Sequence, residues 1–140
     1  MNNPESNFAS WLHKADHDLL NITNNLAASQ IPWDTICFHA QQIGEKVLKG
    51  FLVYHGRDLV KTHDLVALLA PCVTLDPQLA TLESDCRALT SFGVAARYPD
   101  DLFEPTERDG REMVEAAQRV RTAILAKLPQ TKWKCCHIVG

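Results

Sequence analysis

Apolar residues recur every three or four positions through most of the chain, which is the spacing of an amphipathic helix. In the first segment, about Ser6 to Ala28, the residues at this spacing are Phe8, Trp11, Leu12, Ala15, Leu19, Ile22 and Leu26. Ser6 is a suitable N-terminal cap, and Pro32 prevents continuation of the helix. The pattern therefore predicts a long first helix with one apolar face.

Two further helices are predicted in the middle of the chain. The longer one extends from about Trp33 to Tyr54 and stops at Gly56, a residue type that is common just after a helix C-terminus. A short helix is expected from about His63 to Ala70. Thr62 is its predicted cap, and Pro71 is expected to end it.

The remaining apolar pattern predicts helices over about Pro77–Phe92 and Thr106–Leu128. Signals for β-hairpins are almost absent. Four long helices and one short one, joined by short connections, indicate an all-α, antiparallel up-and-down four-helix bundle with one extra short helix. We expect a single domain over residues 1–128 and a loosely attached C-terminal tail over residues 129–140.

Composition limits the function classes. A chain of 140 residues suits one domain, and a net charge of -3 argues against a generally basic nucleic-acid binder but leaves room for a local basic patch. No apolar run is long enough to span a bilayer, and no secretory signal is visible, so we expect a cytoplasmic protein with no membrane association. The five cysteines fit reduced thiols, and three are predicted to be buried in helices: Cys37, Cys72 and Cys86.

Two groups of residues resemble metal ligands. His13 and His17 have the i, i+4 spacing of a metal-binding pair, but they lie opposite the apolar stripe and lack a third ligand nearby. Cys135, Cys136 and His137 are adjacent in the tail. We interpret the first pair as solvated surface histidines and the second group as part of a frayed tail, so we expect no metal and no cofactor.

The second helix carries a polar stripe of His39, Gln42, Glu45, Lys46 and Lys49 beside its apolar arc. Two interpretations are open. The stripe is either the solvated face of a surface helix or the lining of a site. Because imidazole, amide and ammonium groups can bind a phosphate or the edge of a base, the second interpretation predicts nucleotide binding.

Glycines and aromatic residues of the first two helices predict a homodimer. Gly44 and Gly50 lie inside the second helix, where each costs about 1 kcal/mol relative to alanine, which suggests close approach of another helix. Trp11, Trp33 and Phe38 supply more aromatic area than a thin bundle is expected to bury. Large apolar patches at a surface usually mark an interface.

The ordered stretches "FHAQQIGEKVLKGFLVYHG", "KTHDLVALL" and "ARYPDD", preceded by "WLHKADHDLL", resemble the HEPN domain family. The resemblance covers about Phe8 to Leu128. It implies a helical bundle that usually pairs as a homodimer. It also implies a gene beside a small nucleotidyltransferase, in a toxin–antitoxin arrangement. Many members of this family are ribonucleases, marked by an Arg and a His with four to six residues between them, just before the last helix.

The chain departs from the family's ribonuclease motif. After Arg97, the three permitted positions hold Leu102, Phe103 and Glu104, and no His follows within the domain. Arg57 and His63 have the correct spacing but lie in the loop after the second helix, so we interpret that match as a coincidence. The sequence thus resembles the subgroup with "RYP" in place of the Arg–His pair, which is regarded as nucleotide-binding or partner-binding.

From this resemblance we expect a binding module for a nucleotide or RNA, acting as a homodimer with a small nucleotidyltransferase partner and without catalysis of its own. The predicted phosphate-binding residues are His39, Gln42, Lys46, Lys49, Arg97 and Tyr98, with Lys61 and His63 as secondary candidates. The alternative is a metal-independent ribonuclease that uses a non-standard proton acceptor, His39 or His63. A structural role also stays open, in which Arg97 pairs a buried carboxylate such as Asp18.

Overall fold

The computed structural model describes residues 4–95 and 104–129. The helices over these ranges are α1 (Pro4–Leu26), α2 (Trp33–Tyr54), α3 (Leu65–Leu75), the 3₁₀ helix η1 (Pro77–Leu82), α4 (Glu83–Ala95) and α5 (Glu107–Leu125). The described residues contain no β-strand, and none of their helices is sufficiently long and apolar to cross a membrane. The prediction of an all-α bundle is confirmed.

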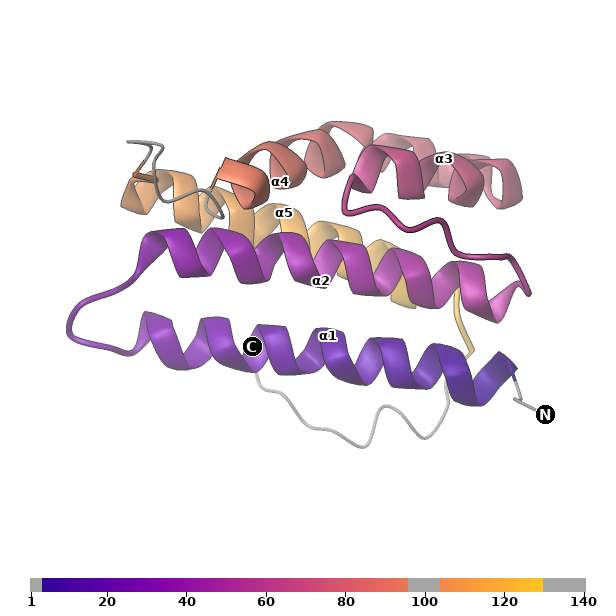
Figure 1. The fold of residues 1–140 in the computed structure, drawn as a ribbon, viewed down its shortest axis with the longest axis horizontal. Coiled ribbons are helices and arrows are strands. Elements are labelled where there is room, and N and C mark those ends of the chain that lie inside the picture. Colours follow the sequence, from indigo (N-terminus) through magenta and orange to yellow (C-terminus); the bar gives the residue numbers. More distant parts are fainter. Residues whose placement is uncertain (1–3, 96–103, 130–140) are drawn as a thin grey trace.

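Helix α2 is the centre of the bundle. It contacts α1, α3, α4 and α5, and Figure 1 shows α1 along one side of it, α3 and α4 along the other, and α5 behind. The four long helices alternate in direction along the chain, so the expected up-and-down order is present (Figure 1). Because α2 is covered on several sides, its apolar arc is wide and completely buried, including Ile36, Ala40, Ile43, Val47, Leu48 and Phe51.

Two glycines of α2 permit close contacts inside the chain. A Cβ at Gly50 would lie 3.3 Å from Trp11 Cβ on α1, and a Cβ at Gly44 would lie 2.7 Å from Leu65 Cδ1 at the start of α3. The predicted close approach is therefore present, but it does not support a dimer, because both glycines face neighbouring helices of the same bundle.

Three predicted helix ends are wrong. Residues 4–6 are already helical, so Ser6 lies within α1 and is not its N-terminal cap. Helix α3 is capped by Asp64, whose carboxylate accepts hydrogen bonds from the backbone N–H groups of Val66 and Ala67. Pro71 lies within α3, because burial of the neighbouring Leu68, Leu69 and Cys72 offsets the loss of one helical hydrogen bond.

Two other predicted ends are confirmed, at Gly56 and Thr106, and two further predictions differ from the structure. Gly56 follows α2 with a φ of +69°, and the N–H groups of Gly56 and Arg57 bond to the carbonyls of Val53 and Leu52, as in a Schellman motif. Thr106 caps α5 through a reciprocal capping box with Asp109. The helix predicted from Pro77 is divided into η1 and α4, and α5 ends at Leu125 instead of Leu128.

Two further glycines, one on α4 and one on α5, hold these helices close to α2. A Cβ at Gly93 of α4 would lie 2.5 Å from both Cβ and Cγ of Gln41. A Cβ at Gly110 of α5 would lie 2.3 Å from Cε3 of Trp33. Both distances are too short for any side chain, so these positions require glycine in the present packing.

Candidate functional site: a seam of buried carboxylates between α1 and α2

Asp18 of α1 binds two side chains of α2, and we call Asp18, His39 and Lys46 the Asp18 cluster. His39 Nδ1 lies 2.7 Å from Asp18 Oδ1, and Lys46 Nζ lies 2.6 Å from Asp18 Oδ2. Asp18 is only 5% exposed. A carboxylate accepts hydrogen bonds, so the Nδ1 of His39 carries the proton. In the neutral ring, Nε2 is then the nitrogen without a proton.

Glu45 organises a second group of side chains, and we call Glu45, Gln41, Lys49 and His63 the Glu45 cluster. Lys49 Nζ and His63 Nδ1 each lie 2.9 Å from a Glu45 oxygen. The amide of Gln41 donates to Glu45 Oε1 at 3.3 Å and to the backbone carbonyl of His63 at 2.8 Å. These contacts attach the connection between α2 and α3 to the middle of α2.

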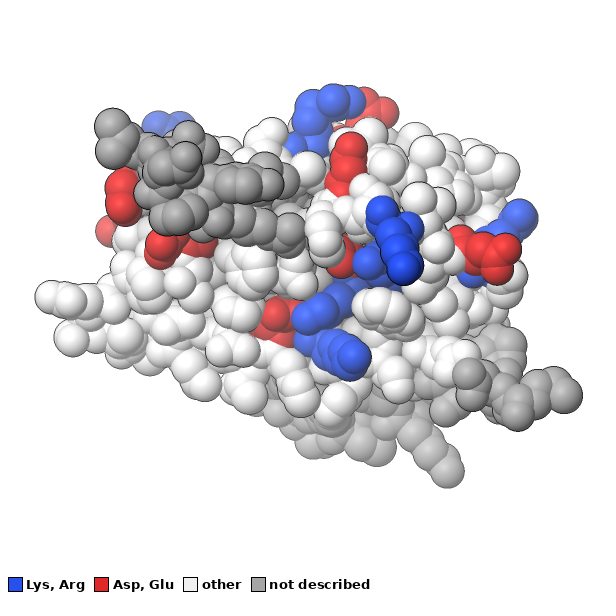
Figure 2. Space-filling view, in the orientation of Figure 1, with Lys and Arg blue, Asp and Glu red and all other residues white. Residues whose placement is uncertain are grey.

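The local fold explains why these polar groups meet. Along α1, Trp11, Lys14 and Asp18 are spaced by three and four residues and therefore share one face of the helix. Helix α2 runs antiparallel to α1, which places His39 and Lys46 beside Asp18 and Lys49 beside Trp11. Figure 2 shows basic side chains gathered beside acidic ones in the middle of this face.

Burial lets us choose between the two interpretations of the polar stripe. Glu45 is buried, and His39, Gln42, Lys46 and Lys49 are half-buried, so the stripe is not simply the solvated face of a surface helix. Wheel positions alone could not show this, because the stripe is covered by residues from α1 and from the connection after α2.

The Glu45 carboxylate has a lowered pKa in the folded protein. Burial alone would raise this pKa, but hydrogen bonds from Lys49 and His63, together with the charge of Lys49, outweigh that effect and move it below the ordinary value of 4.5. The ionised form of Glu45 is therefore the form that the fold stabilises.

A Glu45→Gln substitution should lower the free energy of unfolding by roughly 1–3 kcal/mol at pH 7, because Lys49 loses its charged partner. The contribution of an acid with a lowered folded pKa is present above the unfolded pKa and is lost as the pH falls through the folded pKa. The difference between wild type and variant should therefore be present at pH 7 and shrink steadily below about pH 4.5. Urea unfolding at several pH values measures it, and a difference that does not change with pH would contradict this assignment.

The structure brings together several of the predicted site residues. His39 and Lys46 meet through Asp18, Lys49 and His63 meet through Glu45, and Gln42 donates to Gln41 Oε1 at 2.8 Å. Lys61 is exposed in the connection after α2. Arg97 and Tyr98 lie outside the described residues, and so does the proposed pairing of Arg97. Within the described chain, the partners of Asp18 are His39 and Lys46.

Sequence reasoning missed the organising role of Asp18 and Glu45. The sequence indicates Glu45 only as one member of the stripe, and Asp18 only as a partner for Arg97 and as part of the stretch "WLHKADHDLL" that resembles the family's first helix. One signal was available, since Asp18 lies directly before the core residue Leu19 and an acidic residue so close to an apolar stripe needs a cationic partner. The identity of that partner, which is more than 20 positions away along the chain, could not be read from periodicity.

The predicted histidine pair is exposed, and the cysteines of the described helices are buried. His13 and His17 are exposed, with ring centroids 4.5 Å apart. No group of three metal-ligating side chains occurs among residues 4–95 and 104–129, and the group Cys135, Cys136 and His137 lies outside these ranges. Cys37, Cys72 and Cys86 are buried as predicted, and burial raises the pKa of each thiol to about 12, so they are poor nucleophiles at neutral pH.

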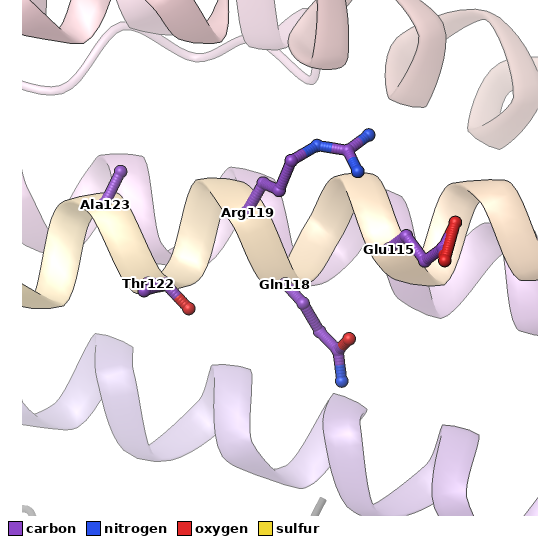
Figure 3. Close-up of a pocket in the computed structure, with 5 residues that line it drawn as sticks. All are labelled: Glu115, Gln118, Arg119, Thr122 and Ala123. Atoms are coloured by element: carbon purple, nitrogen blue, oxygen red, sulfur yellow. The ribbon is translucent and has the colours of Figure 1, made fainter.

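A shallow groove also lies along α5, lined by Glu115, Gln118, Arg119, Thr122 and Ala123. Figure 3 shows that all five side chains come from this one helix and that Arg119 and Gln118 point in different directions. Arg119 is already bound to Asp85 of α4 by two hydrogen bonds of 2.9 Å. We call the Asp18 and Glu45 clusters together the seam between α1 and α2. The seam is the better candidate site because it contains two buried carboxylates, whereas Arg119 in the groove is exposed and already paired.

The chain belongs to the HEPN domain family, because the family model for the HEPN domain matches residues 8–128. Among solved structures, the chain is similar to the crystal structure of TT1696 from Thermus thermophilus. The TM-score is 0.72 and the sequence identity 26%, and the match covers 86% of this chain and 98% of that one. No curated protein matches the chain.

Proposed function

We propose that this HEPN domain is a binding module for a nucleotide or RNA and has no catalytic activity of its own. We also propose that it acts with a small nucleotidyltransferase partner, as in a toxin–antitoxin pair. We also assign it to the subgroup that carries "RYP" in place of the Arg–His ribonuclease motif. The observation that carries the binding proposal is the pair of buried carboxylates, Asp18 and Glu45, which hold two lysines and two histidines along one seam.

This arrangement suits phosphate recognition because the cationic groups are held in place before a ligand arrives. A lysine ammonium has three donors, and the contacts of Lys46 and Lys49 with the two carboxylates use one donor each. The remaining donors can bind phosphate oxygens without displacing the carboxylate. Fixing the lysine side chains in advance also reduces the conformational entropy that binding would otherwise cost.

The charge of the seam predicts moderate affinity. Two lysines face two carboxylates, so the four groups sum to zero, and a positive charge appears only when a histidine is protonated. Binding then depends on short-range, charge-assisted hydrogen bonds, each contributing about 1.5–3 kcal/mol. Two or three such contacts give millimolar to micromolar dissociation constants after the costs of association.

A second candidate function, a metal-independent ribonuclease, is favoured by one observation. Asp18 and Glu45 each accept a hydrogen bond from the Nδ1 of a histidine, and this leaves the Nε2 of His39 and His63 as the proton acceptor in the neutral ring. A ribonuclease needs a group that takes the proton of the 2′-hydroxyl and one that protonates the leaving oxygen. The absence of a His after Arg97 within the domain argues for the binding module instead.

Labelled single-stranded RNA separates the two functions. The wild-type protein is expected to bind RNA more weakly as salt rises and to leave it intact. Lys46→Met with Lys49→Met should raise the dissociation constant by at least roughly 100-fold, because two charge-assisted contacts are lost. Arg119→Met, a cation outside the seam, is the matched control and should bind like wild type. Turnover of RNA that is abolished by His39→Ala or His63→Ala would establish the ribonuclease instead.

We further propose that the chain forms a homodimer. The half-buried Phe38 of α2, together with Leu20 at 45% and Val60 at 65% exposure, supplies apolar area for an interface. Light scattering at micromolar concentration should give twice the monomer mass of 15.7 kDa. A monomer mass under these conditions would contradict the proposal.

A further inference from the structure

Trp11 extends the seam beyond the two carboxylate clusters. It lies two helical turns before Asp18 on the same face of α1, or about 10 Å along the helix axis. Its side chain is half-buried, and two ammonium groups lie over its ring: Lys49 Nζ at 5.4 Å and Lys14 Nζ at 5.9 Å from the ring centroid. Lys49 also binds Glu45, so this lysine connects the tryptophan to the Glu45 cluster.

The other described tryptophan is in a different position. Trp33 packs its ring against the backbone of α5, where a Cβ at Gly110 would lie 2.3 Å from Cε3. That ring therefore fills space between helices, and the Arg111 guanidinium of α5 also lies 5.2 Å from its centroid. Trp11 instead makes its close backbone contact through its Cβ, near Gly50, while the side chains of Lys14 and Lys49 lie over its ring.

Lysines over an aromatic ring can be exchanged for a nucleobase. An ammonium over an exposed indole gains only a weak attraction, whereas a base that stacks on an aromatic side chain gains a stronger one. When the base takes the place above the ring, the exposed Lys14 can turn to the phosphate of the same nucleotide, while Lys49 keeps its contact with Glu45 and offers a remaining donor. The lysines are then paired with the negative phosphate, while the base covers the indole ring.

Resting on the proposed function, the geometry points to Trp11 as a base-stacking platform beside the phosphate-binding lysines, so that the seam takes an unstacked nucleotide of a single strand. Bare phosphate would use only the lysines. The bases of a double helix are already stacked on one another and cannot reach the ring. The ligand class is therefore single-stranded nucleic acid or a free nucleotide.

Tryptophan fluorescence tests this directly. The chain has three tryptophans, so Trp33→Phe with Trp133→Phe leaves Trp11 as the only tryptophan. Circular dichroism checks that this reporter variant is folded. Three probes are titrated at constant ionic strength: adenosine monophosphate, a short single-stranded adenosine RNA, and inorganic phosphate. We expect the first two to quench the fluorescence with saturation, and phosphate to leave it unchanged.

Substitutions of Trp11 give the second measurement. Trp11→Leu should raise the dissociation constant for the single-stranded RNA roughly 5- to 100-fold, while Trp11→Phe should stay within a few-fold of wild type. In one outcome, RNA binding depends on Lys46 and Lys49, but the Trp11 fluorescence is not quenched and Trp11→Leu has the wild-type dissociation constant. This outcome would overturn the stacking platform and leave the proposed function intact. Absence of binding by all probes would overturn both. If Trp11→Leu does not fold, the fluorescence titration alone decides.

Discussion

Replacement of Asp18 by alanine should lower the free energy of unfolding by roughly 2–4 kcal/mol. Removal of one member of a buried ion pair leaves its partners uncompensated, which typically costs about 3–5 kcal/mol. His39 and Lys46 are 20% and 22% exposed in their side chains, so water offsets part of that loss. Urea unfolding followed by circular dichroism measures the change.

A control variant and a double-mutant cycle test whether the loss of stability comes from the contact between Asp18 and Lys46. Asp16→Ala on the same helix removes a buried carboxylate that binds Arg121 of α5 at 2.9 Å, outside the seam. It should also destabilise the protein but leave RNA binding unchanged. In a double-mutant cycle, Asp18→Ala and Lys46→Met should show a coupling of about 0.5–3 kcal/mol, as expected for residues in contact. Additive effects of the two substitutions would show that the 2.6 Å contact contributes nothing to stability.

Replacement of Gly110 by alanine should destabilise the protein by roughly 1–3 kcal/mol, although alanine is the better helix former by about 1 kcal/mol. The added methyl would lie 2.3, 3.1 and 3.3 Å from three atoms of the Trp33 ring. A rigid ring packed between two helices cannot move away by changing one rotamer, so α5 would have to shift from α2. Thermal unfolding should show a decrease of several degrees.

Gly44→Ala is the matched control for this experiment. Its methyl would meet Leu65 Cδ1 at 2.7 Å, the end of a flexible side chain that can rotate away. We expect a change close to zero, because the higher helix propensity of alanine offsets the adjustment of Leu65. Trp33→Leu should recover part of the stability lost in Gly110→Ala. A stable Gly110→Ala protein with unchanged melting temperature would show that Trp33 adapts easily.

The long helices could be predicted because their faces are set by burial, which imposes a repeat of three and four residues on the sequence. Helix ends were less predictable where two signals competed. Ser6 is suitable at a helix start, but it lies within α1. Asp64 and Thr62 both offer a capping oxygen, and Asp64 is used. Pro71 was misjudged because the packing around α3 is not visible in local sequence.

The candidate site was predictable only in part, because most of its contacts join different helices. A helical wheel shows that His39, Lys46 and Lys49 share an arc of α2, because this depends on one helix. It cannot show that Asp18 reaches two of these residues from α1, or that Glu45 binds His63 from the next connection. Similarly, Gly93 and Gly110 look ordinary in the sequence, because their importance depends on Gln41 and Trp33 across a helix interface.

The position of the seam in the chain has a consequence for how the protein folds. Its described residues all lie between Trp11 and His63, and most come from α1 and α2, which are joined by the short segment 27–32. Contacts between such neighbours require closure of only a small loop and so form quickly. During synthesis, Asp18, His39 and Lys46 leave the ribosome well before α5 is complete, so the ion pairs of the seam can help to hold the first helical hairpin together until the C-terminal helix covers α2.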